Sequence, residues 1–319
     1  LLVGDPGCIS GDSQVALYTK GMANIQNLGQ YHKQPIREAV VKIRKNKSDK
    51  AYDFATVFQH YKQQPVLKVV TETGKELVCT YNQPLLTKKS WVRADELNLD
   101  TKIRVMPKIP NYIKKLVPTN FVKIKKTYGG LKEVNLPKNF TPDLASLCGY
   151  IIGDGNIHTN GYRVTCYINN QETDIIPTLI GLWEGTFGIE PRVFTNDPSQ
   201  YVKTIEEENG LLRQFVSTQQ IHYIEINSRQ VAQLLLFLAN KRVPQEIFRS
   251  PKGVISKFIS WLFEADGCAF GNGRGRTSIQ LKSRSAALLK DVQLLLLYFG
   301  IQGRIIEDNL CIRRSRDID

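Results

Sequence analysis

One pattern occurs twice in this chain of 319 residues, at a constant separation. Two helix-like segments, 141–155 and 254–267, each end in Asp-Gly, and their aspartates, Asp154 and Asp266, are 112 residues apart. The sequences FGIEPRV and FGIQGRI repeat with the same separation. Because two independent landmarks share one offset, the chain is predicted to contain an internal duplication.

Each half of the duplication predicts the order helix, strands, helix, strands, helix. The first half is the longer one, because 74 residues separate its aspartate from the closing Ser-Arg, against 49 in the second half. Its expected elements are a helix at 141–155, strands at 162–169, 191–195 and 221–227, a helix ending at Phe187 and a helix from Ser228. Those of the second half are a helix at 254–267, a helix within 283–300, strands at 277–282, at 303–307 and from Leu310, and a helix from Ser315.

Residues 8–105 have a different character, with short strand-like runs separated by turns. The runs at 66–70 and 75–80 predict a hairpin closed near Gly74. Further strands are expected at 85–87, 90–97 and 102–106. No amphipathic helix of three turns is evident here, so we expect a compact all-β domain of about 100 residues.

The formal net charge of +13 is concentrated between these regions, because residues 101–140 contain ten Lys or Arg and one Glu. Tyr112, Phe121 and Tyr128 are interleaved with these charges. We interpret 106–140 as a basic connector that contacts a nucleic-acid backbone. A solvated linker remains the alternative.

Several classes of protein are disfavoured by the sequence. The apolar run at 294–301 is too short for a membrane span, and the amino terminus lacks the basic region of a signal peptide. The six cysteines form no Cys-x-x-Cys pair, so neither a zinc site nor a disulfide scaffold is expected. We expect a cytoplasmic protein that makes no membrane contact.

The two Asp-Gly helix ends suggest a chemistry. Small residues near both ends would let the helices pack closely and bring Asp154 and Asp266 together. Two adjacent carboxylates have raised pKa values unless a divalent cation lies between them, and oxygen ligands suit Mg²⁺. Metal-dependent phosphodiester hydrolysis uses such an arrangement. The alternative is that each aspartate is a solvated residue before a capping glycine.

The segments LCGYIIGDG and LFEADG resemble the two motifs of LAGLIDADG homing endonucleases, and KRVPQEIF at 241–248 resembles the block between them. The resemblance implies an α+β endonuclease with two pseudo-symmetric αββαββα halves, at 141–240 and 241–319. It also implies a monomer that cleaves a long, asymmetric site in double-stranded DNA. The implied ligands of Mg²⁺, for which Mn²⁺ can substitute, are Asp154, Asp266, Gly153 and Ala265. Lys241 matches a basic residue near the scissile phosphate, and an ordinary lysine after a helix is the equal alternative.

The segment CISGDSQV resembles the opening block of an intein, which implies that 8–105 is a Hint splicing domain. Cys8 would then be the nucleophile that converts the Gly7–Cys8 peptide into a thioester. A buried, unreactive cysteine is the alternative. Residues 1–7 (LLVGDPG) resemble the start of the Walker A loop in minichromosome maintenance helicases, so the intein would interrupt that loop.

The chain departs from the patterns of these families in three ways. Thr80 and Asn82 match the Thr-x-x-His block that polarises the scissile amide, but Gln83 stands where His is expected. Gln83 can donate a hydrogen bond but cannot act as an acid near neutral pH. The closing His-Asn pair and most of the last endonuclease helix are absent, so we expect either a fragment or a companion carboxy-terminal piece.

The sequence therefore predicts a bifunctional enzyme that splices its flanking host segments and cleaves DNA. One alternative retains the fold as a splicing-only or DNA-binding relic with an inactive endonuclease. A helicase or ATPase fragment is a third reading, but no Lys-Ser completes the phosphate loop.

Overall fold

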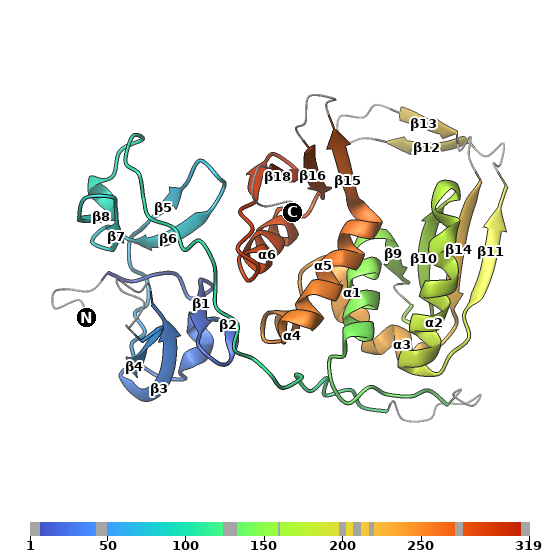
Figure 1. Cartoon of the computed structure of the whole chain (residues 1–319), viewed down its shortest axis with the longest axis horizontal. Coiled ribbons are helices and arrows are strands. Elements are labelled where there is room, and N and C mark those ends of the chain that lie inside the picture. Colours follow the sequence, from blue (N-terminus) through green and yellow to red (C-terminus); the bar gives the residue numbers. More distant parts are fainter. Residues whose placement is uncertain are drawn as a thin grey trace. The chain divides into compact units, whose positions relative to one another are not determined.

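The computed structural model describes residues 7–42, 50–123, 133–158, 160–197, 202–206, 212–216, 220–271 and 277–313. The chain forms two compact units (Figure 1). Unit 1 contains Leu1–Val117, Gln245–Ile255 and Gly267–Asp319, and unit 2 contains Pro118–Pro244 and Ser256–Asp266. This division interleaves distant segments, and the boundaries inferred from the sequence at 105, 140 and 240 stay a prediction.

The amino-terminal part of unit 1 is built from short antiparallel strands and two 3-10 turns. Glycine at 74 has a φ of 79° and closes the predicted hairpin. The expected strand at 102–106 is reduced to one bridge between Thr87 and Ile103. The elements are a sheet in the order β2-β1-β3-β4 (β1 Gln14–Leu17, β2 Gly21–Asn24, β3 Gln34–Val41, β4 Tyr52–Phe58), the ribbons β5–β6 (Val66–Val70, Glu76–Thr80) and β7–β8 (Pro84–Leu86, Trp91–Arg93), and the turns η1 (Ile25–Leu28) and η2 (Ala94–Glu96).

The predicted duplication is visible in two sheets with the same strand order. Unit 2 contains the sheet β11-β14-β10-β9, and unit 1 contains β17-β18-β16-β15, both antiparallel throughout. The hairpin β12–β13, inserted between β11 and β14, accounts for the greater length of the first half. The strands are β9 (Gly155–Ile157), β10 (Val164–Asn169), β11 (Arg192–Asn196), β12 (Val202–Glu206), β13 (Leu212–Val216), β14 (Ile221–Ile226), β15 (Gly267–Gly271), β16 (Thr277–Lys282), β17 (Arg304–Ile306) and β18 (Asn309–Arg313).

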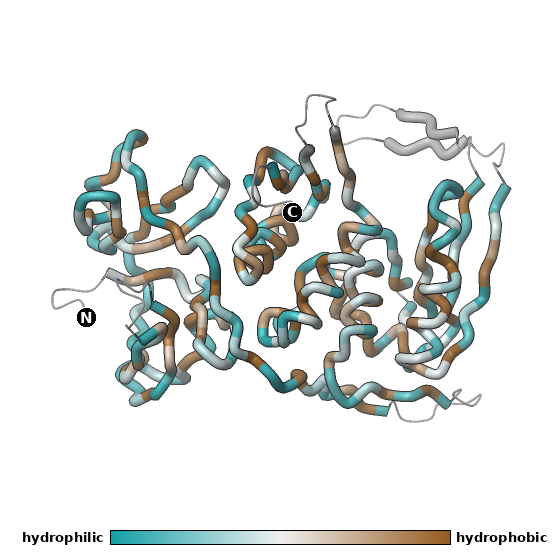
Figure 2. The backbone as a smooth tube through the Cα atoms, in the orientation of Figure 1, coloured by the Kyte–Doolittle hydropathy of each residue, from teal (hydrophilic) through white to brown (hydrophobic). Residues whose placement is uncertain are grey.

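The helices occupy equivalent places in the two halves, which confirms the α+β organisation. In unit 2, α1 packs against α2 and β10. In unit 1, α6 is rich in apolar residues, and its Leu288, Val292 and Leu295 are buried (Figure 2). The helices are α1 (Pro142–Asp154), η3 (Asn170–Ile175), α2 (Ile176–Phe187), α3 (Arg229–Leu234), η4 (Leu236–Asn240), α4 (Gln245–Phe248), α5 (Lys252–Asp266) and α6 (Ala286–Leu296).

The first helix of unit 2 begins as the sequence predicts. Thr141 is its N-cap, because the Thr141 side chain accepts a hydrogen bond from the N–H of Leu144 at 3.2 Å, and Pro142 occupies the first turn. All residues from Leu144 to Ile152 are buried. A helix that is buried all round is a core element, so its carboxyl end is held firmly.

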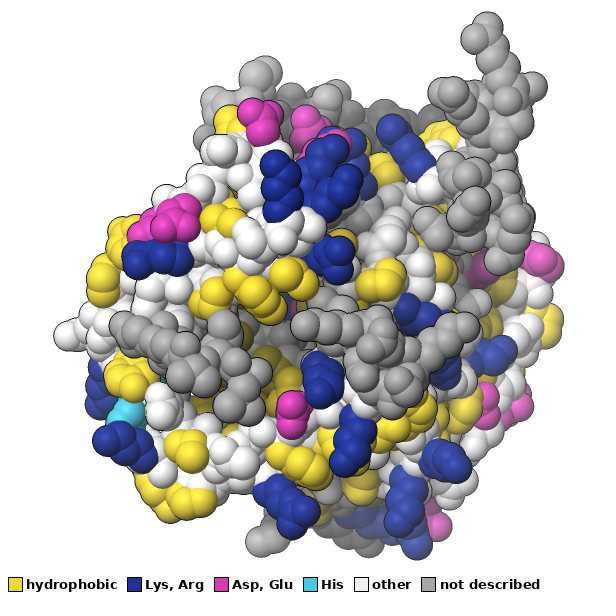
Figure 3. All heavy atoms as spheres, turned by 60° about the vertical axis from the view of Figure 1, so that its left-hand side comes forward, with side chains coloured by type: hydrophobic (Ala, Val, Ile, Leu, Met, Phe, Trp, Pro, Cys, Tyr) yellow, Lys and Arg dark blue, Asp and Glu magenta, His cyan; other side chains and the backbone are white. Residues whose placement is uncertain are grey.

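Several predictions concern residues outside the described part of the chain, among them 1–6, Tyr128 in the connector and the helix expected from Ser315. The described connector residues form no helix, and Pro118 bridges to Asn139. Lys and Arg are more frequent than Asp and Glu on the face shown in Figure 3. Within the described ranges, no helix has the length and apolar character that crossing a membrane requires.

Candidate functional site

Two glycines on one face of α1 determine how closely α5 approaches it in unit 2. A Cβ placed on Gly149 would lie 2.4 Å from the carbonyl oxygen of Phe258, and one on Gly153 would lie 2.4 Å from the Cβ of Ala265. Positions four residues apart share a helix face. The two helices are therefore in contact along a line that only glycine permits.

This contact brings the two predicted carboxylates to one place. Asp154 is the last residue of α1, and Asp266 is the last residue of α5. The carboxyl carbon of Asp266 lies 3.5 Å from the Cβ position of Gly153, the residue before Asp154. Both side chains are partly buried. The two helix ends thus present a pair of carboxylates side by side.

The surroundings of the two carboxylates, Asp154 and Asp266, disfavour their ionised form. Burial, and then the charges of Asp266 and Glu172, raise the pKa of Asp154 to about 6, although Lys241 acts in the opposite direction. Burial also raises the pKa of Asp266, and Lys241 again lowers it. Raised pKa values that have a desolvation and a charge component are typical of functional carboxylates.

Lys241 lies at the carboxyl end of α1. Its Nζ donates to the carbonyl oxygens of Gly153 at 3.1 Å, of Gly155 at 3.4 Å and of Ile152. The carbonyls of Ile152 and Gly153 are among those that the end of a helix leaves without partners inside the helix, and a cation there also complements the helix dipole. Burial lowers the pKa of Lys241. The ammonium group therefore caps the helix that carries Asp154.

The donors at this site fit a hard divalent cation in part. The two carboxylates supply oxygen, which is the ligand type that Mg²⁺ prefers. Within the described ranges, however, no cluster of three or more His, Cys, Asp or Glu side chains could hold a metal. The carbonyl of Gly153 already accepts from Lys241, and Gly153 touches Ala265. The remaining ligands would have to be main-chain oxygens, water or a phosphate.

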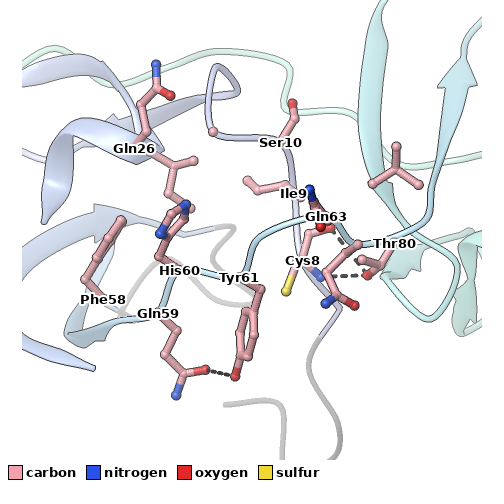
Figure 4. Close-up of a pocket in the computed structure, with 14 residues that line it drawn as sticks. Cys8, Ile9, Ser10, Gln26, Phe58, Gln59, His60, Tyr61, Gln63 and Thr80 are labelled. Carbon is pink, nitrogen blue, oxygen red and sulfur yellow. Dashed lines mark hydrogen bonds between the residues drawn. The ribbon is translucent and has the colours of Figure 1, made fainter. Parts of the chain in front are cut away.

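The second candidate site lies in unit 1, where Cys8 meets the end of β6. The N–H of Cys8 donates to Oγ1 of Thr80 at 2.8 Å, and that hydroxyl donates to Oδ1 of Asn82 at 2.7 Å. The N–H of Thr80 donates to the carbonyl of Cys8 at 2.8 Å. The nitrogen of the Gly7–Cys8 peptide is thus held by the hydroxyl of Thr80 (Figure 4), and Asn82 orients that hydroxyl.

Gln83 contributes to this site mainly through its backbone. A Cβ on Gly7 would lie 2.2 Å from the Cα of Gln83, so the two residues are in close contact. The side-chain amide of Gln83 donates to the carbonyl of Pro84 at 3.2 Å. This side-chain hydrogen bond therefore joins Gln83 to the next residue and not to the predicted scissile peptide.

A cavity of about 340 Å³ opens beside Cys8 in unit 1. Figure 4 shows Cys8, His60 and Tyr61 among the residues that line this cavity. No signal in the sequence pointed to His60, because it is a single histidine in a glutamine-rich segment and no spacing links it to Cys8. The cavity is lined by Cys8, Ile9, Ser10, Gly11, Ile25, Gln26, Phe58, Gln59, His60, Tyr61, Gln63, Gln64, Val66 and Thr80.

Comparison with known proteins relates part of the chain to a protein family. Residues 253–318 match the LAGLIDADG-like domain family. The matched residues include Asp266 and the whole of the β17-β18-β16-β15 sheet.

Two curated relatives and one solved structure are similar to longer parts of the chain. Glutamine–fructose-6-phosphate aminotransferase of Methanocaldococcus jannaschii is 24% identical over 53% of this chain and 14% of that protein. The replicative DNA helicase DnaB of Synechocystis is 24% identical over 94% of this chain and 31% of the helicase. The solved structure of the Ssp DnaB mini-intein variant is 24% identical with a TM-score of 0.27, over 34% of this chain and 66% of that one. The chain thus spans about a third or less of both curated relatives.

Proposed function

We propose that the chain is an intein with a Hint splicing domain and a LAGLIDADG homing endonuclease that cleaves both strands of DNA at a specific site. The observation that supports the nuclease proposal is the contact between α1 and α5. It brings together Asp154 and Asp266, the last residues of these two helices. The match of 253–318 to the LAGLIDADG-like family supports it.

Phosphodiester hydrolysis by this pair would need a cation. Asp154 and Asp266, with main-chain oxygens of Gly153 and Ala265, would hold Mg²⁺ or Mn²⁺. When bound, such an ion neutralises charge on the phosphate and lowers the pKa of a water molecule. The protein's own contribution is to hold two carboxylates in fixed positions on two closely packed helices, with Lys241 limiting their repulsion.

The DNA would lie on the open face of each sheet. In unit 2 the register places Tyr167, Tyr223 and Phe194 in one row across β10, β14 and β11, on the face opposite to buried Cys166 and Ile224. Tyr167 and Phe194 are exposed. Such a ribbon fits the major groove, and the basic connector would add contacts to phosphates. The extra hairpin β12–β13 makes the halves unequal, as an asymmetric target requires.

A cleavage assay tests the nuclease proposal. The substrate is the uninterrupted host gene, incubated with the protein and Mg²⁺ and analysed for nicks and double-strand breaks. We expect the Asp154→Asn plus Asp266→Asn variant to lose activity. The matched control is Asp143→Asn, which removes an exposed carboxylate at the other end of α1 and should leave cleavage intact. Equal cleavage by the double variant and the wild type would contradict the proposal.

For splicing, we propose that Cys8 attacks the carbonyl of Gly7 and forms a thioester, assisted by Thr80, Asn82 and the backbone of Gln83. Residues 1–7 would be the end of the host segment, in a minichromosome maintenance helicase. The relatives support an inserted element, because an aminotransferase and a helicase share this segment over a minority of their lengths. What they share is therefore separate from either named activity. A companion carboxy-terminal piece would complete the reaction.

Thiol-induced release tests the splicing proposal. In a fusion with a reporter before Leu1, dithiothreitol should release the reporter, and Cys8→Ala should abolish release. Cys268→Ala is the control, because Cys268 is an exposed cysteine of β15. Release that does not depend on Cys8 would refute Cys8 as the nucleophile.

One observation favours a second candidate, a DNA-binding relic that does not cut. The ammonium of Lys241 already donates to the carbonyl of Gly153, one of the proposed metal ligands. DNA binding that weakens with salt, without cleavage at any Mg²⁺ concentration, would support the relic.

A further inference from the structure

The cavity beside Cys8 contains few groups that can move a proton near neutral pH. Among its lining residues the titratable side chains are those of Cys8, His60 and Tyr61, and the others are apolar, hydroxyl or amide groups. A thiol needs to lose its proton before it attacks a carbonyl, because the thiolate is the nucleophile. Imidazole changes its charge between pH 5 and 8, so it is the side chain suited to that task.

The position where the resemblance leads us to expect a histidine cannot supply this base. Gln83 stands there, and its amide donates to the carbonyl of Pro84 at 3.2 Å. Thr80 holds the N–H of Cys8 and is itself a donor to Asn82, so neither residue is placed to take a proton from sulfur. Cys8 instead lines the same cavity as His60, which forms part of the cavity wall (Figure 4).

The histidine is anchored in this wall through its backbone. The N–H of His60 donates to Nδ1 of His32 at 3.2 Å, and the ring of His32 lies edge-on to Tyr61 with 5.1 Å between centroids. Tyr61 in turn donates to Oε1 of Gln59 at 3.1 Å. These contacts hold the turn after β4, so that the imidazole of His60 belongs to the cavity and is exposed.

We propose that His60 is the general base for Cys8 in the acyl shift, an inference that rests on the proposed splicing activity. The imidazole accepts the proton of the Cys8 thiol while sulfur forms a bond to the carbonyl carbon of Gly7. The bond from that carbon to the nitrogen of Cys8 then breaks, and the imidazolium returns the proton to the nitrogen. The result is a thioester and a free amine, with no further reactant.

The test is the pH dependence of dithiothreitol-induced release in the reporter fusion, from pH 5.5 to 9. A general base typically contributes about 10²–10⁴-fold, so His60→Gln should slow release by at least about 10-fold at pH 7. It should also remove the part of the profile that rises near neutral pH. Added imidazole should restore part of the rate in His60→Gly. Gln64→Ala, which alters the same cavity without removing an imidazole or a contact that holds the turn of His60, should keep the wild-type pH profile.

Each outcome bears on a different claim. His60→Gln with the wild-type rate and profile, or with a slower rate but an unchanged profile, would overturn the role of His60 as a base. Release that persists in Cys8→Ala would instead overturn the proposed splicing activity. Circular dichroism of the His60 variants establishes whether they fold. If His60→Gln does not fold, His60→Gly with added imidazole provides a second measurement.

Discussion

Replacing Gly153 with alanine should separate the two helices that carry the carboxylates. The new Cβ would lie 2.4 Å from the Cβ of Ala265 and 3.5 Å from the carboxyl carbon of Asp266. Apolar carbons approach to about 3.5–4.0 Å, so the helix ends would have to move apart by roughly 1 Å. Overpacking of this kind costs about 1–3 kcal/mol.

Helix propensity acts against this cost, because alanine is favoured over glycine by about 1 kcal/mol inside a helix. We therefore expect Gly153→Ala to lower the free energy of unfolding of unit 2 by up to about 2 kcal/mol. The control is Gly181→Ala in α2, where a Cβ would meet nothing within 4 Å. Gly181→Ala gains the higher helix propensity of alanine and has no overpacking cost. It should therefore be more stable than wild type by about 0.5–1 kcal/mol.

Urea denaturation followed by tryptophan fluorescence measures both variants, because Trp183 and Trp261 lie in unit 2. We also expect Gly153→Ala to reduce DNA cleavage at least about 10-fold below Gly181→Ala, since small displacements in a catalytic site cost up to about 10²-fold. If both variants were equally stabilised and equally active, the inferred contact between α1 and α5 would be wrong.

Three further predictions concern single groups. Since the raised pKa of Asp154, about 6, exceeds the value of about 3.9 expected for an unfolded chain, the native state binds more protons between pH 4 and 6. With a chelator present, the free energy of unfolding should therefore fall by about 1–2 kcal/mol as the pH rises from 4 to 6. Asp154→Asn should make the free energy of unfolding less dependent on pH in this window. Lys241→Met should destabilise unit 2 by about 2 kcal/mol in urea titrations, because the carbonyls at the end of α1 lose their donor; a stability equal to that of wild type would exclude the capping role. Thr80→Val should slow thiol-induced release at least about 10-fold, because the N–H of Cys8 loses its acceptor; an unchanged rate would remove Thr80 from the site.

Local sequence signals predicted much of the secondary structure. Thr141-Pro142 predicted the start of α1, and the glycine at 74 predicted the hairpin, because both depend on short-range geometry. The constant offset between Asp154 and Asp266 predicted that both would end a helix. The residues of β9 and β15 gave no strand signal of their own, since GNI and GCAFG have low β propensity and are paired only through tertiary structure.

The sites were less accessible to sequence reasoning. The capping role of Lys241 depends on a left-handed backbone (φ 51°) that turns the residue after η4 toward α1, and no motif encodes that turn. His60 reaches the cavity of Cys8 only because β4 ends where the chain returns toward the amino terminus. Long-range placements of this kind follow from packing rather than from spacing in the sequence.

The central claim is that Asp154 and Asp266 jointly hold a divalent cation. A titration with Mn²⁺ followed by electron paramagnetic resonance measures this directly, in the wild type, the Asp154→Asn plus Asp266→Asn variant and Asp143→Asn. We predict that the wild type and Asp143→Asn bind Mn²⁺ and that the double variant does not. Equal binding by all three proteins would contradict the claim.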